Sequence, residues 1–123
     1  QGEQVTIVTY GMGVHWALKT LENDTAIKAD LIDLRTLSPL DTETIYASVK
    51  KTGKVIILQE DSMFGGIASD ISALISEHCF EDLDAPIKRV AGLETPIPFA
   101  ADLEREYLAN NRFDAALKEL IAY

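Results

Sequence analysis

The sequence contains a single cysteine among its 123 residues, Cys79, so the chain cannot form a disulfide within itself. It has no apolar run close to the roughly 20 residues that a membrane-spanning helix needs. It also lacks a leader in which charged residues precede an apolar segment and small residues, the pattern that directs secretion. We therefore expect a cytoplasmic protein in which Cys79 is a reduced, partly buried thiol.

Basic residues are scarce. Lys and Arg number 11 against 20 Asp and Glu, which gives a net charge of −9. This balance argues against nucleic acid and against an anionic membrane as partners. The acidic residues also cluster along the chain, at Glu77, Glu81, Asp82 and Asp84 and again at Asp102, Glu104 and Glu106. A solvated surface and a surface for a basic partner both account for such clusters.

Metal-binding and catalytic patterns are weak. The two histidines, His15 and His78, fall in different expected helices and have no Cys-x-x-Cys or His-x-x-x-His spacing. The adjacent carboxylates Glu60 and Asp61 could bind Mg²⁺ or serve as a general base. They have no nucleophile or basic partner nearby in the sequence, so a structural role at a strand end is favoured.

The turn Gly11-Met12-Gly13 precedes an expected helix and could direct backbone N–H groups at an anion. A dinucleotide-binding fingerprint would require a third glycine where Trp16 stands. A purely structural role for the turn is therefore favoured over an anion-binding site.

Alternating apolar segments indicate an α/β fold. Buried strands are predicted at residues 5–9, 31–34, 55–58 and 87–90, and helices at residues 14–21, 41–52, 67–79 and 113–121. Strands that alternate with helices imply a parallel sheet covered on both faces. We expect one domain over residues 1–123, with three α/β/α layers and a mainly parallel sheet of four to five strands.

The segment DLRTLSPLD is the most specific stretch. Asp33 and Arg35 flank Leu34 at the carboxyl end of a predicted strand, where open α/β sheets usually place functional groups. The two side chains could fix the following turn or contact another subunit, since arginine is enriched at interfaces. Both interpretations remain open at this point.

The chain resembles the C-terminal domain of the beta subunit of thiamine-diphosphate-dependent 2-oxo acid dehydrogenases, in the transketolase C-terminal-domain superfamily. The matching stretches run in one order over nearly the whole chain: VTIVTYG with His15, DLRTLSPLDTETI, Gln59-Glu60-Asp61 with Gly65-Gly66, LDAPIKRVAG, and TPIPFA followed by Leu103-Glu104. The pyruvate and branched-chain types fit better than transketolase itself because of the proline-rich ending.

The resemblance implies a non-catalytic assembly domain excised from a longer chain. The parent enzyme would use thiamine diphosphate and magnesium to decarboxylate a 2-oxo acid and acylate a lipoyl group. This chain lacks the family's Gly-Asp-Gly diphosphate motif, so we expect it to bind no cofactor and to be inactive alone. The implied location is the bacterial cytoplasm or the mitochondrial matrix.

The implied partners are the alpha subunit and N-terminal beta domain of the parent enzyme, a second beta subunit, and the basic subunit-binding domain of the acyltransferase. The resemblance places docking of that basic domain at Asp84 and Tyr123. Contacts between beta subunits are expected at Asp33, Arg35, Glu60, Asp61 and Phe64.

Two other classes of protein share parts of this pattern. A receiver-type signalling domain needs an acidic pair at the end of the first strand, and Tyr10-Gly11 stands there instead. A regulatory domain that binds an anion or metabolite at Gly11, Met12 and Gly13 is the alternative that stays open.

Overall fold

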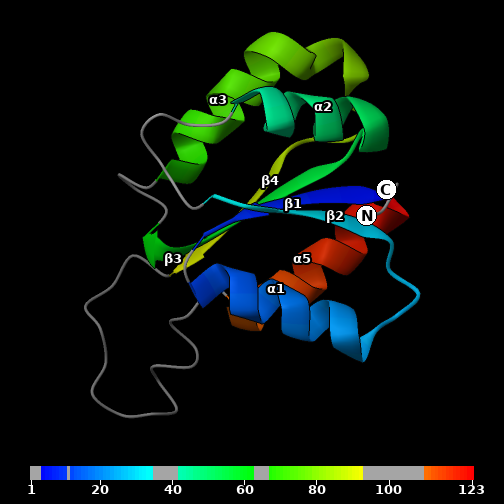
Figure 1. The fold of residues 1–123 in the computed structure, drawn as a ribbon, viewed down its shortest axis with the longest axis vertical. Helices are drawn as coiled ribbons and strands as arrows, with labels where there is room; N and C mark the ends of the chain where they lie inside the picture. Colours follow the sequence, from blue (N-terminus) through cyan, green and yellow to red (C-terminus); the bar gives the residue numbers. More distant parts are fainter. Residues whose placement is uncertain (1–3, 11, 35–41, 63–66, 93–109) are drawn as a thin grey trace.

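The chain folds into a four-stranded parallel β-sheet with helices on both faces (Figure 1). The computed structural model describes residues 4–10, 12–34, 42–62, 67–92 and 110–123, and all structural statements below concern those residues. The predicted α/β class with a mainly parallel sheet is confirmed. No described helix combines the length and the apolarity that crossing a bilayer requires.

The sheet has the strand order β2-β1-β3-β4. Its strands are β1 (Val5–Thr9), β2 (Ala29–Asp33), β3 (Val55–Ser62) and β4 (Lys88–Gly92). All three pairings are parallel, and Ile7 of β1 lies opposite Leu31 on one side and Ile56 on the other. Every residue of β1 is buried, as expected for the apolar, β-branched sequence VTIVT in a central strand covered on both faces.

Among the described residues, two helices cover each face of the sheet (Figure 1). The first pair is α1 (Met12–Asn23) and α5 (Asn110–Ala122), and the second pair is α2 (Thr42–Thr52) and α3 (Ile67–Cys79), which continues into the short 3₁₀ helix η1 (Phe80–Asp82).

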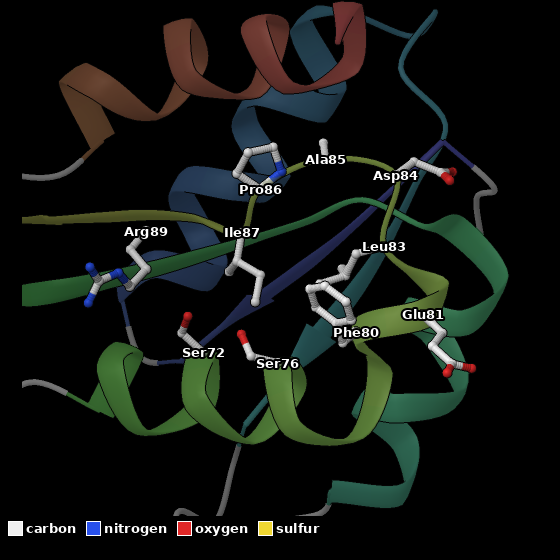
Figure 2. A pocket seen from close by; sticks show the side chains of 10 residues that line it. All are labelled: Ser72, Ser76, Phe80, Glu81, Leu83, Asp84, Ala85, Pro86, Ile87 and Arg89. Carbon is white, nitrogen blue, oxygen red and sulfur yellow. The ribbon is translucent and has the colours of Figure 1, made fainter.

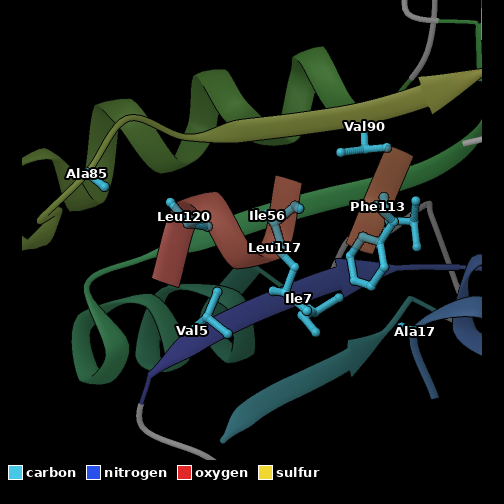
Figure 3. Close-up of a cluster of buried hydrophobic side chains, with 10 residues drawn as sticks. Val5, Ile7, Ala17, Ile56, Ala85, Val90, Phe113, Leu117 and Leu120 are labelled. Carbon is cyan, nitrogen blue, oxygen red and sulfur yellow. The ribbon is translucent and has the colours of Figure 1, made fainter. Parts of the chain in front are cut away.

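Each face has its own apolar core. Alternate β1 residues divide between them: Ile7 packs with Phe113 and Leu117 of α5, whereas Val8 packs with Ile45 of α2 and Ile75 of α3. Figure 3 shows the first of these clusters, in which α5 lies against β1 and β3. Alternation of side chains across the sheet is what separates the two cores.

Several predicted boundaries were wrong. Strand β2 begins at Ala29, two residues earlier than predicted. The prediction missed this start because the polar Asp30 interrupts the apolar pattern. Strand β3 continues to Ser62, beyond the predicted residues 55–58, and Glu60 and Asp61 lie within it near its end. The register between β3 and β4 shifts between Leu58 and Ser62, and an irregularity of this kind leaves no apolar pattern in the sequence.

Gly53 follows the last residue of helix α2, a position at which glycine is common. Its φ of +75° is the left-handed conformation that favours glycine. Its N–H donates to the Val49 carbonyl at 2.8 Å and so closes the last turn of the helix. The chain then enters β3 directly.

Candidate functional site

The parallel sheet separates the residues expected to contact partners into two groups. Asp33 ends β2, and Glu60 and Asp61 lie in the last part of β3, so these three stand at the carboxyl edge of the sheet. Asp84 precedes β4 and therefore stands at the opposite, amino edge. Parallel strands present their like ends at one edge, so two separate surfaces result.

Asp84 is held on the amino edge by its backbone. Its N–H donates to the carbonyl of Gly53 at 2.7 Å, so the segment before β4 is attached to the end of helix α2. The Asp84 side chain is exposed, as is that of Glu81 in η1. The two carboxylates thus lie on a surface whose backbone is fixed.

Helix α5 ends at the same edge of the sheet. Lys54, the residue before β3, donates from Nζ to the Ile121 carbonyl at 2.9 Å. Tyr123 follows and is 69% exposed, with its N–H donating to the Leu120 carbonyl at 3.2 Å. The adjacent residues Gly53 and Lys54 therefore bond to Asp84 and to Ile121, which lies two residues before Tyr123.

A groove of about 720 Å³ opens between α3 and the segment that leads into β4 (Figure 2). Apolar side chains of Phe80, Leu83 and Ile87 lie along it, between Arg89 at one end and the carboxylates of Glu81 and Asp84 at the other. Serine side chains of α3 complete its wall. We call this surface, lined by Ser72, Ser76, Phe80, Glu81, Leu83, Asp84, Ala85, Pro86, Ile87 and Arg89, the β4 groove.

A buried network of hydroxyl groups holds α2 against the amino edge. The Thr6 hydroxyl lies 2.8 Å from that of Ser48 and 2.7 Å from that of Thr52. Ser48 in turn donates to the Asp30 carboxylate, and Thr52 donates to the Lys54 carbonyl at 3.0 Å. The network fixes the end of α2, and through Gly53 it fixes the backbone of Asp84.

The Asp30 carboxylate is ionised within this network. Burial opposes its ionisation, but the hydrogen bond from Ser48 and the Lys51 ammonium group, 3.1 Å away, together hold the Asp30 pKa below its ordinary value of 3.8. Sequence reasoning missed this network. Its signal was the spacing of Ser48 and Thr52, four residues apart and on one face of α2, opposite a threonine in a buried strand.

The turn after β1 has a packing requirement of its own. The Gly13 N–H donates to the Tyr10 carbonyl at 3.1 Å. A Cβ atom at Gly13 would lie 2.0 Å from Thr9 Oγ1, so helix α1 approaches the sheet more closely than any side chain would permit. Gly11 and the Met12 side chain lie outside the described residues. The predicted anion site at Gly11, Met12 and Gly13 therefore stays a prediction.

The residues expected at a subunit interface are only partly described. Asp33 is exposed at the end of β2. The backbone of Glu60 and Asp61 lies in β3, while their side chains fall outside the description. Arg35 and Phe64 lie outside the described residues altogether. These interface assignments remain predictions.

The remaining reactive groups do not form a catalytic cluster in the part of the chain that is described. Cys79 is free and fully buried, and this burial raises the pKa of its thiol. His78 packs against the Tyr46 ring, with centroids 4.9 Å apart, and His15 is exposed on α1. Across residues 4–10, 12–34, 42–62, 67–92 and 110–123, no three His, Cys, Asp or Glu side chains gather as metal ligands.

Comparison with protein families gives one match. The family described as "Transketolase, C-terminal domain" matches residues 1–112. Among curated proteins, the chain is 45% identical to the 2-oxoisovalerate dehydrogenase subunit beta of Bacillus subtilis, over all of this chain and 39% of that protein. It is 44% identical to the pyruvate dehydrogenase E1 component subunit beta of Rickettsia felis, over 85% of this chain and 33% of that protein.

A third relative is the mitochondrial 2-oxoisovalerate dehydrogenase subunit beta of Dictyostelium discoideum, 40% identical over 98% of this chain and 34% of that protein. Among solved structures, a split-gene transketolase described as an inactive beta4 tetramer superposes with a TM-score of 0.75 at 26% identity. The superposition covers 99% of this chain and 39% of that one. The chain thus spans at most about two fifths of the length of these relatives.

Proposed function

Because the chain belongs to the transketolase C-terminal domain family, we propose that it is the assembly domain of the beta subunit of a 2-oxo acid dehydrogenase. Its relatives are beta subunits of 2-oxoisovalerate and pyruvate dehydrogenases. The parent enzyme would oxidatively decarboxylate a 2-oxo acid and pass the acyl group to lipoyl. Within it, this domain docks the basic subunit-binding domain of the acyltransferase and contacts a second beta subunit.

One observation carries the docking proposal. Glu81 of η1 and Asp84, whose backbone N–H bonds to the Gly53 carbonyl, present exposed carboxylates at the edge where helix α5 also ends. An acidic surface on a fixed backbone suits a basic partner, because the backbone that carries the carboxylates does not have to be ordered when the partner arrives. The overall charge of −9 would add long-range attraction for such a partner.

The two edges of the sheet allow docking and subunit contact at the same time. The docking residues Asp84 and Tyr123 stand at the amino edge, whereas the proposed contact with the second beta subunit uses the carboxyl edge. This contact is assigned to Asp33, Arg35, Glu60, Asp61 and Phe64.

We propose that the thiamine diphosphate and magnesium of the parent enzyme are held outside this chain. The sequence has no Gly-Asp-Gly motif, and in the described ranges no three acidic or histidine side chains gather around a possible metal position. We therefore assign the cofactors to the parent enzyme's alpha subunit and N-terminal beta domain, and we assign no catalytic step to this chain. We propose the bacterial cytoplasm or the mitochondrial matrix as the location of the parent enzyme, because its relatives include bacterial and mitochondrial beta subunits.

The test is a calorimetric titration of the chain with the basic subunit-binding domain of its cognate acyltransferase, at low and high salt. We expect binding that weakens as salt screens the charges. The Asp84→Asn variant should bind about tenfold more weakly, equivalent to roughly 1.4 kcal/mol, because it removes one charge from the contact and leaves the backbone bond to Gly53 intact.

Asp70→Asn is the matched control. Asp70 is an exposed aspartate in the first turn of α3, at the carboxyl edge, and its replacement makes the same change in net charge. This control should leave the affinity within about twofold of the unsubstituted chain, since its long-range effect is screened. If both variants lose the same amount of affinity, the effect of Asp84→Asn is explained by net charge alone, and docking at the amino edge is contradicted.

Anion binding at Gly11, Met12 and Gly13 is the weaker alternative. The Gly13 N–H already donates to the Tyr10 carbonyl, and the glycine is explained by the closeness of Thr9.

A further inference from the structure

The β4 groove differs from the acidic surface around it because its middle is apolar. Phe80 is 74% exposed, and the half-buried side chains of Leu83 and Ile87 continue the apolar strip beside it. Single exposed apolar residues are common on protein surfaces. A connected apolar strip with charged groups at its ends is instead typical of an interaction site.

The walls of the groove are fixed. The Leu83 N–H donates to the Phe80 carbonyl at 3.3 Å, which closes the η1 turn, and the Asp84 N–H donates to the Gly53 carbonyl at 2.7 Å. On β4, Lys88 pairs with Glu119 of α5 and Val90 packs on Phe113. Strand alternation therefore turns Ile87 and Arg89 to the other face, toward α3.

Arg89 supplies a cation at the end of the groove remote from Asp84 (Figure 2). Its Nη1 donates to the Ser69 hydroxyl at 2.9 Å, which sets the direction of the side chain. That bond uses one of the five N–H donors of a guanidinium group. An oriented guanidinium at the end of an apolar strip can bind a carboxylate or carbonyl oxygen of a partner.

We propose that the β4 groove receives a segment of the docked basic domain in one defined direction. A basic side chain of the segment pairs with Glu81 and Asp84, an apolar side chain packs on Phe80 and Ile87, and an oxygen acceptor bonds to Arg89. This inference rests on the proposed docking function and adds an apolar and directional component to it. The groove is open to solvent, so it could not enclose most of a small molecule's surface, whereas a protein segment needs only one side covered.

The first test compares Phe80→Ala with Leu18→Ala in the titration described above. Both residues are exposed, Phe80 at 74% and Leu18 at 44%, so both variants should fold. Leu18 lies on α1, on the opposite face of the sheet (Figure 1). We expect Phe80→Ala to weaken binding roughly tenfold at low and at high salt alike, because apolar contacts are not screened. Leu18→Ala should leave the affinity unchanged.

The second test uses Arg89→Gln, for which two explanations predict opposite signs. If only overall charge attracts the basic domain, removing a cation from an acidic chain strengthens binding. If Arg89 bonds to the docked segment, binding weakens by about threefold to tenfold, as for the loss of one hydrogen bond. Thermal unfolding of the variant shows whether the loss of the bond to Ser69 has disturbed the fold.

The outcomes separate the two proposals. If Asp84→Asn weakens binding while Phe80→Ala and Arg89→Gln do not, docking at the amino edge stands and the groove proposal is wrong. If the unsubstituted chain does not bind the basic domain at all, the docking function fails and the groove proposal fails with it. Weaker binding in both groove variants, with both folded, supports the groove.

Discussion

The close approach of helix α1 to the sheet makes a sharp prediction for Gly13→Ala. The added Cβ would lie 2.0 Å from Thr9 Oγ1, far inside contact distance, while the next nearest atoms are 3.4 Å away. Thr9 is fully buried and its hydroxyl donates to the Leu58 carbonyl at 2.8 Å. Turning the threonine away would relieve the contact but break this buried hydrogen bond.

The size of the effect follows from these contacts. Overpacking costs about 1–3 kcal/mol, and a buried polar group left unpaired costs about 1–3 kcal/mol. Alanine regains roughly 0.5–1 kcal/mol over glycine within a helix. We therefore expect Gly13→Ala to lower the free energy of unfolding by about 1–3 kcal/mol, measured by urea denaturation followed by circular dichroism.

A second substitution reverses the sign. Among the described residues, Thr9→Ala removes the one atom that would lie closer than 3.4 Å to the added Cβ. In that background Gly13→Ala should therefore be neutral or stabilising by up to roughly 1 kcal/mol. Thr9→Ala alone provides the reference, since it carries the cost of the lost bond to Leu58. If Gly13→Ala destabilises the chain equally in both backgrounds, the steric account of this glycine is refuted.

Two further predictions concern the amino edge. Gly53→Ala should lower the free energy of unfolding by about 1–3 kcal/mol, because φ is +75° at this residue and the added Cβ would meet the Asp84 carboxylate. Urea denaturation measures this free energy. A value within about 0.5 kcal/mol of the unsubstituted chain, the size of an ordinary surface change, would contradict the prediction. Asp30→Asn should make the free energy of unfolding depend less on pH in acid. The pKa of Asp30 in the folded chain lies below 3.8, so the ionised carboxylate stabilises the fold above pH 3.8, and this contribution is lost as the pH falls through the lower folded pKa. Unfolding curves between about pH 2 and pH 7 test this, and an unchanged slope below about pH 4 would contradict it.

The sequence predicted the fold class because the strands that form the sheet centre are almost wholly apolar. The apolar patterns around Ile7 and Ile57 predicted buried strands, and both residues are buried in the structure. Strand β2 was misplaced because it lies at the sheet edge, where a half-buried strand tolerates the polar Asp30. The residue pattern of one strand does not show whether that strand lies at the edge or in the centre of a sheet.

The candidate site was predictable in part. Asp84 was identified through the family resemblance. Its fixed position depends on a backbone hydrogen bond to Gly53, a residue much earlier in the chain. The groove beside it was missed, since Phe80 and Arg89 belong to different elements and line one groove only because the fold brings η1 and β4 side by side. Long-range contacts of this kind leave no local pattern in a sequence.

Hydrogen–deuterium exchange of the chain, alone and in complex with the basic subunit-binding domain, tests the central claim most directly. The account predicts slower exchange on binding at residues 80–89 and at the end of α5, with the carboxyl edge around Asp33 unchanged. Protection confined to the carboxyl edge, with residues 80–89 exchanging as in the free chain, would contradict docking at the amino edge.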